Sequence, residues 1–167
     1  VQPVVFLHPQ KKCSIIKHNR LAMLLKEINM EDTVIVVMLK DRETGFLEKE
    51  LGSYSFSEDV GMVYNIYAVE SEEGKKVVLR LSCDKEIEDW EYDAIFDYYD
   101  MEPLAAQVES VEEEEGHYNP VWVIQFAFSD AHEEMEKKIS HIVNTHKEEL
   151  LSVYDAIADK KDDYIEE

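Results

Sequence analysis

The stretch "MVYNIYAVESEEGKKVVLRLSC", residues 62–83, decides the fold class of this chain. Two apolar, β-branched runs, residues 62–69 and 76–83, flank an acidic turn that contains a glycine. Runs of this kind on both sides of a short polar turn are typical of a β-hairpin. The stretch therefore predicts two antiparallel strands near the middle of the chain.

A helix and a second hairpin are predicted after the first hairpin. "LSCDKEIEDWEYDAIFDYYD" (81–100) predicts a helix with Ser82 or Asp84 as its N-cap and with acidic residues in its first turn. "LAAQVESV" (104–111) and "VWVIQFAF" (121–128) predict strands on either side of the acidic turn "EEEEGHYNP". Both segments therefore have the order strand, acidic turn with glycine, strand, helix. This order indicates a degenerate ββα repeat, or a coincidence of common turn and cap residues.

The C-terminal part predicts a long helix of about 30 residues, with apolar residues at three and four spacing. Ser129 or Asp130 is its expected N-cap, and Glu133 completes a capping box with Asp130. Such a helix serves as the main core helix or pairs with a second copy to form a homodimer. Its apolar face comprises Met135, Ile139, Ile142, Val143, Leu150, Val153, Tyr154 and Ile157.

The N-terminal part adds shorter elements to this pattern. Residues 3–7 predict a short strand and residues 18–29 predict an amphipathic helix. Residues 33–40 are apolar throughout, which is typical of a central strand covered on both faces. Residues 46–51 alternate like a half-exposed strand, and residues 52–61 predict a loop or an irregular edge.

Together these elements predict an α+β fold with a largely antiparallel sheet of about six to seven strands. The long C-terminal helix and a second, aromatic-rich helix should pack on this sheet. Two arrangements stay open, a helix-grip-like fold and the ββα repeat. We expect a single domain over residues 1–160, followed by a charged, frayed tail at 161–167.

Composition narrows the compartment and the membrane class. The chain has only two cysteines, Cys13 and Cys83, which are too few for a disulfide scaffold. Its first residues lack a secretory leader pattern, and no apolar run has the length of a membrane span. These features favour a cytoplasmic protein that does not enter membranes.

The charge is concentrated in one third of the chain. The net charge is −21, and residues 86–136 contain 17 acidic residues and no Lys or Arg. Such a field repels nucleic-acid phosphates, so direct nucleic-acid binding is disfavoured, and it favours basic partners or cations. The alternative interpretation is that the charge only keeps the protein soluble.

"DWEYDAIFDYYD" (89–100) places its four aspartates at spacings of four, four and three. On a helix these aspartates form a narrow acidic stripe beside a broad aromatic face. The repulsion between them costs about 1 kcal/mol, so a solvated helix face explains the stripe without any function. A basic partner that docks on the stripe is the functional alternative, with Trp90 and Tyr98 as aromatic anchors at its edge.

No metal, cofactor or catalytic site is predicted. A straight helix spreads its carboxylates along a line, and no loop of carboxylates closes around a Ca²⁺ or Mg²⁺ ion. His8, Cys13 and His18 are only three candidate zinc ligands, where a structural zinc site has four. Cys83 is expected to be a buried or half-buried thiol. His132 and His146 lie near the apolar face of the last helix, and we expect hydrogen bonds from one or both.

Two hypotheses for function follow. The first is a non-catalytic regulatory or adaptor-like protein whose acidic surface docks a basic protein partner. The second is a small-molecule binding domain with an apolar pocket between the sheet and the C-terminal helix. Enzymatic action has no specific support in the sequence. The partner-binding residues expected under the first hypothesis are Asp89, Trp90, Asp93, Asp97, Tyr98, Asp100, Glu112, Glu113, Glu114 and Glu115.

Overall fold

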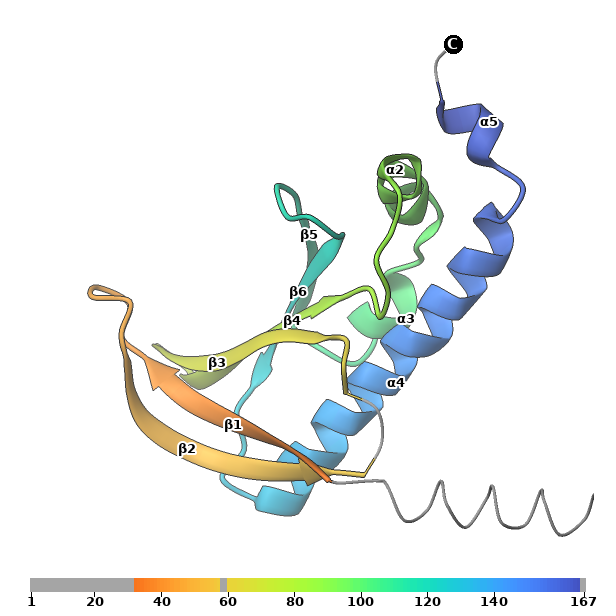
Figure 1. Ribbon diagram of the computed structural model, residues 1–167. Coiled ribbons are helices and arrows are strands. Elements are labelled where there is room, and N and C mark those ends of the chain that lie inside the picture. The colour runs from red at the N-terminus through yellow and green to blue at the C-terminus, as the bar shows by residue number, and fades with distance from the viewer. Residues whose placement is uncertain (1–31, 58–59, 166–167) are drawn as a thin grey trace, which may run out of the picture. The chain divides into compact units, whose positions relative to one another are not determined.

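The computed structural model describes residues 32–57 and 60–165 (Figure 1). The described helices and strands all belong to one compact unit that begins at Thr33. The strand and helix predicted at residues 3–7 and 18–29 lie outside the described residues.

Within the described residues, six strands form one sheet in the order β2-β1-β3-β4-β6-β5. Every neighbouring pair is antiparallel except β1 and β3, which are parallel. With the long helix α4 this confirms the predicted α+β class and the largely antiparallel sheet. The strands are β1 (Thr33–Lys40), β2 (Leu47–Phe56), β3 (Val63–Ser71), β4 (Gly74–Ser82), β5 (Ser110–Glu114) and β6 (Val121–Ala127).

The hairpin that decides the fold class is formed by β3 and β4, as predicted. Gly74, at the turn, has a φ angle of 117°, which an L side chain rarely adopts. Strand β4 then pairs with β6, so the two predicted hairpins lie side by side in the sheet.

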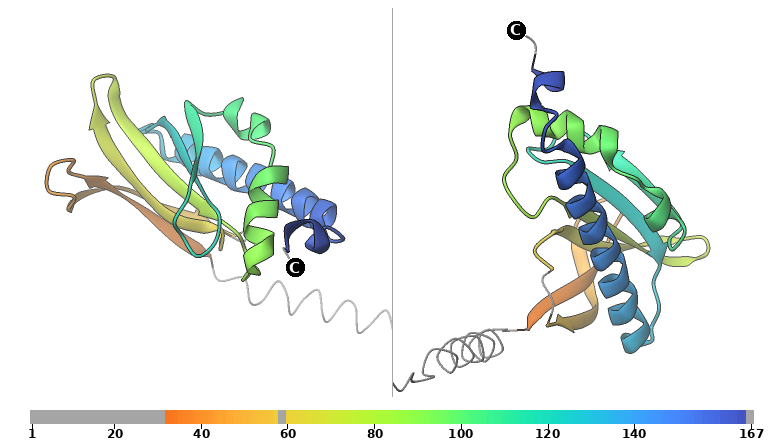
Figure 2. Two further views of the ribbon diagram at one scale, coloured as in Figure 1. Left: turned by 90° about the horizontal axis from the view of Figure 1, so that it is seen from above. Right: turned by 90° about the vertical axis from the view of Figure 1, so that its right-hand side faces the viewer.

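Helix α4 (His132–Ile157) lies along one face of the sheet (Figure 2). Its predicted apolar face is confirmed, although Tyr154 is only partly buried. The predicted caps are wrong, because the N-cap is Ala131 and makes no side-chain cap bond. The Ser129 hydroxyl instead accepts from the Ala131 N–H and donates to the Glu134 carboxylate.

The prediction that residues 33–40 are covered on both faces is wrong. Ile35 and Val37 point into the core, whereas Val34 and Val36 are 56% and 41% exposed. Among the described residues, the core cluster joins α2, α3 and α4 to one face of the sheet, and the alternate β1 residues on the other face contact solvent. Residues 52–56, predicted as a loop or irregular edge, continue β2 at the sheet edge.

Helix α2 (Asp89–Tyr98) begins later than predicted. Its N-cap is Glu88, which forms a capping box with Glu91, so neither Ser82 nor Asp84 caps the helix. The reason is that Ser82 still belongs to β4, and its hydroxyl donates to the Pro120 carbonyl oxygen at 2.9 Å.

Two short elements also differ from the sequence pattern. Pro103 is in the first turn of helix α3 (Glu102–Ala105), so the strand predicted at 104–111 starts only at Ser110, in β5. Helix α5 (Lys161–Tyr164) lies in the tail for which we expected fraying, and it packs near α2 (Figure 1).

Replacement of Gly52 should destabilise the edge strand β2. A Cβ atom at this position would lie 2.5 Å from the hydroxyl oxygen of Tyr54, whose side chain is buried. We expect Gly52→Ala to lower the free energy of unfolding by about 1–3 kcal/mol through overpacking. Urea denaturation measures the loss, and Ser55→Ala, an exposed change in the same strand, should cost little. If Tyr54 is the cause, Gly52→Ala should cost less in a Tyr54→Leu background.

Candidate functional site

An open groove of about 810 Å³ lies between helix α2 and the β5–β6 turn. Its walls contain carboxylates from both elements, Asp93 and Asp97 from α2 and Glu113 and Glu115 from β5 and its turn. These four residues are exposed, and we call them the acidic quartet. The other residues that line the groove are Tyr92, Phe96, Gly116, His117 and Tyr164.

The α2 carboxylates come from the predicted stripe. Asp89, Asp93 and Asp97 follow one another at i,i+4 along the exposed side of the helix. Asp100 lies beyond the helix end, and its carboxylate accepts the backbone N–H of Glu102 at 2.9 Å. Asp100 therefore has a local structural role before α3, while the other three remain on the helix surface.

The glutamates of β5 divide between the two faces of the sheet, because successive strand residues point to opposite sides. Glu113 lines the groove, whereas Glu114 lies on the other face with Arg80. The Glu114 carboxylate is 2.8 Å from His117 Nε2 and accepts from Arg80 Nε at 3.0 Å, and these bonds lower its pKa. Glu112 alternates in the same way as Glu114, so residues 112–115 do not form one patch.

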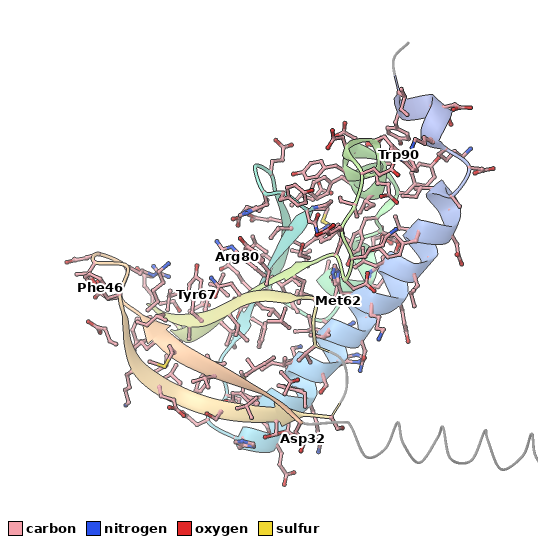
Figure 3. All side chains as sticks on the ribbon, viewed as in Figure 1. Asp32, Phe46, Met62, Tyr67, Arg80 and Trp90 are labelled. Carbon is pink, nitrogen blue, oxygen red and sulfur yellow. The ribbon has the colours of Figure 1, made fainter. Side chains whose placement is uncertain are left out.

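The two predicted aromatic anchors occupy different environments. Trp90 is partly buried against the core, and its Nε1–H donates to Glu88 Oε2 at 2.7 Å. Figure 3 shows Trp90 on α2, on the side where α5 lies. Tyr98 is 43% exposed at the end of α2 and does not line the groove.

The aromatic walls of the groove are residues that the sequence analysis did not select. Tyr92 and Phe96 lie one helical turn apart on α2, with an edge-to-face ring contact at 5.2 Å. Tyr164 belongs to α5, and its hydroxyl donates to Asp97 Oδ2 at 2.8 Å. The i,i+4 spacing of Tyr92 and Phe96 was a usable sequence signal, but nothing local indicated that Tyr164 joins them.

A family described as a "Family of unknown function (DUF6762)" matches residues 30–165. The chain belongs to this DUF6762 family. The match covers every element that forms the groove, including α5. No curated protein and no solved structure matches the chain.

The described part of the DUF6762 fold bears on two further predictions, which concern metal binding and membrane insertion. Among residues 32–57 and 60–165, no three His, Cys, Asp or Glu side chains are grouped to hold a metal ion. His8, Cys13 and His18 lie outside the described residues. No helix in the described part of the chain is both long and apolar enough to cross a membrane.

Cys83 has the environment of an inert thiol. It is buried directly after β4, which confirms the prediction of a buried or half-buried thiol. Burial raises the pKa of its thiol to about 11, so little thiolate forms near neutral pH. Cys83 is therefore a poor candidate nucleophile.

The two histidines of α4 both make hydrogen bonds, as expected. His132 is exposed near the start of α4, and its Nε2 lies 2.9 Å from the Ser53 carbonyl oxygen. His146 is completely buried, between Tyr99 Oη at 2.6 Å and the Ser82 carbonyl oxygen at 3.0 Å. Burial lowers the pKa of His146 to about 4, so its ring is neutral at pH 7.

Proposed function

We propose that this DUF6762 protein is a non-catalytic binding module whose acidic groove holds a basic segment of a protein partner. The observation that supports it is the convergence of four exposed carboxylates from α2 and β5 on one groove. Carboxylates from two separate elements surround a cation better than the single line on a helix. The proposal is of a regulatory or adaptor-like protein.

The charge of the groove is not neutralised from within. Its described lining residues include no Lys or Arg, and the one histidine among them, His117, pairs with Glu114, which does not line the groove. A lysine or arginine from a partner would therefore meet carboxylates that lack a cationic partner in the groove wall. The rings of Tyr92 and Phe96 offer apolar faces for the stems of such side chains, and for cation–π contacts.

The expected affinity is modest. An exposed ion pair contributes about 0.2–1 kcal/mol, and an exposed cation–π contact about 0.5–1 kcal/mol. Four ion pairs with one or two ring contacts reach about 1–6 kcal/mol, and the middle of this range corresponds to dissociation constants of about 1 mM. Binding should therefore depend strongly on salt, unless the partner adds contacts outside the groove.

The test compares two variants that lose the same charge. The groove variant carries Asp93→Asn, Asp97→Asn, Glu113→Gln and Glu115→Gln. The control variant changes four exposed glutamates in or next to the β1–β2 and β3–β4 turns, away from α2 (Figure 1). These control changes are Glu43→Gln, Glu48→Gln, Glu70→Gln and Glu72→Gln.

We expect the groove variant to bind a fluorescent oligolysine peptide about tenfold more weakly than wild type, and the control variant to lose less than about twofold. Fluorescence anisotropy at low and at moderate salt measures both. The groove variant should not lose stability, because it removes like charges at i,i+4 and across the groove. Equal weakening in both variants would assign the binding to net charge and would contradict the groove as its site.

A small-molecule site is a second candidate, because a pocket of about 360 Å³ lies between β6 and the first turns of α4. The centre of the interface between sheet and helix is filled, since Ile139, Ile142 and Val143 are completely buried. A ligand between the sheet and α4 would therefore bind at the start of α4, near Phe126, Met135 and Lys138. A thermal-shift screen tests this site, and a stabilising compound should lose its effect in a Met135→Ala variant.

A further inference from the structure

We propose that α5 is an internal ligand of α2, and that the basic partner segment displaces it. This inference rests on the proposed function, because it concerns what occupies the same surface before a partner binds. It also defines the partner segment, which should present a cation where Lys161 lies and a hydrogen-bond donor on an aromatic ring where Tyr164 lies.

The contacts of α5 with α2 use the chemistry that the groove offers to a partner. Lys161 Nζ lies 2.5 Å from Glu88 Oε2 and 5.8 Å from the centre of the Trp90 ring. At the other end of α2, the Tyr164 hydroxyl donates to the Asp97 carboxylate. A cation therefore binds a carboxylate beside an aromatic ring, and an aromatic hydroxyl binds one member of the acidic quartet.

The position of α5 interrupts the acidic surface of α2. Tyr164 is part of the wall of the acidic groove. Lys161 and Ile165 line a neighbouring groove of about 440 Å³, together with Asp89 and Trp90. Displacement of α5 would therefore leave one continuous surface along α2, with carboxylates and aromatic rings at both ends.

The attachment of α5 is weak enough to be displaced. The helix has four residues, none of which is buried. Its ion pair with Glu88 is at least half exposed on both sides, and such a pair changes an equilibrium constant by no more than about fivefold. Short segments with few buried contacts open far more readily than the core does.

The spacing in α5 gives the pattern expected in the partner. Lys161 and Tyr164 are three residues apart, so they lie on the same side of one helical turn. A segment with Lys or Arg at one position and Tyr three residues later would reproduce both contacts. Such a segment should bind better than one that offers only the cation.

The experiment uses the full chain and two labelled peptides, one of Lys-Ala-Ala-Tyr repeats and one of Lys-Ala-Ala-Ala repeats. The variants are Lys161→Ala and Tyr164→Phe, which remove the two contacts of α5. Lys160→Ala is the matched control, because it removes the same charge from a lysine that pairs with Asp163 inside the same segment. Fluorescence anisotropy at low salt gives the dissociation constants.

We expect Lys161→Ala and Tyr164→Phe each to tighten binding of the tyrosine-containing peptide by about twofold to fivefold. Each change removes one contact between α5 and α2, so the α2 surface is open to the peptide for a larger fraction of the time. Lys160→Ala should change it by less than about twofold, the effect of net charge alone. Binding that is equal in all three variants, or weaker in Lys161→Ala and Tyr164→Phe, would overturn the displacement while leaving the acidic groove as a site. Absence of binding in every variant would overturn the proposed function and the displacement together.

Discussion

Between pH 6.5 and pH 4, the wild-type protein should lose about 3 kcal/mol of unfolding free energy relative to a His146→Gln variant. This expectation comes from the buried position of His146, whose pKa falls from 6.5 to about 4 in the folded protein. In that window the unfolded chain binds a proton at His146 and the folded chain does not. Stability is therefore fully present above pH 6.5 and is lost as the pH falls toward 4.

The two hydrogen bonds of His146 explain why its ring stays neutral in the folded protein. The Ser82 carbonyl oxygen can only accept a hydrogen bond, so His146 Nε2 must carry a hydrogen. His146 Nδ1 is then the acceptor for the Tyr99 hydroxyl. A protonated ring would place a second N–H against that hydroxyl and would bury a positive charge between a hydroxyl and a carbonyl group, which are both neutral.

Urea denaturation of both proteins at several pH values measures the difference. All other titratable groups are the same in the two proteins, so their contributions largely cancel. At pH 7.5 the variant should be the less stable of the two, because glutamine cannot reproduce both hydrogen bonds at the ring positions. A gap that stays constant from pH 7.5 to pH 4 would contradict a neutral, buried His146.

Trp122→Ala should lower the free energy of unfolding by about 3–5 kcal/mol. Trp122 is completely buried in β6 and contacts the rings of Phe96, Tyr99 and His146, at centroid distances of 5.4, 4.3 and 5.0 Å. Its removal would leave a large cavity where α2, β6 and α4 meet. The surrounding helices cannot close such a cavity without losing their other contacts.

Two comparisons separate this cavity effect from other causes. Trp122→Phe should cost less than half as much, since Trp122 Nε1 has no hydrogen-bond partner among the described residues. Trp90→Ala should also cost less, because Trp90 is only partly buried. Circular dichroism during urea denaturation follows all variants, and a loss below about 1 kcal/mol for Trp122→Ala would contradict its place in the core.

The buried cluster also supports the groove. Phe96 contacts Trp122 on its inner side and lines the acidic groove on its outer side. Tyr99, one turn further along, holds the end of α2 to α4 through His146. The position of the α2 carboxylates therefore depends on the same residues whose loss we expect to cost the most stability.

Local patterns were enough for most of the elements. The β-branched runs on both sides of the Gly74 turn predicted β3 and β4, and the three and four spacing of apolar residues predicted the buried side of α4. Both patterns report which residues avoid water, and they repeat with the period of the element itself. The aspartate stripe of α2 was visible for the same reason.

Element ends and faces depended on contacts between distant residues. Ser82 was expected to cap α2, but its hydroxyl bonds to Pro120 and it remains in β4. Val34 and Val36 were expected to be covered, but the helices that form the core cluster pack on one face of the sheet only. An apolar run cannot show how many of its faces will meet other elements.

The acidic groove combines a charge pattern that is visible in the sequence with a shape that only the tertiary structure creates. The sequence alone determined that residues 86–136 carry a net charge of −17 and that α2 has an acidic side. Only the sheet order, with β5 next to β6 and β6 next to β4, brings Glu113 and Glu115 opposite Asp93 and Asp97. Charge is a property of each residue, whereas a groove exists only where elements distant in sequence pack together, so tertiary structure decided the candidate site.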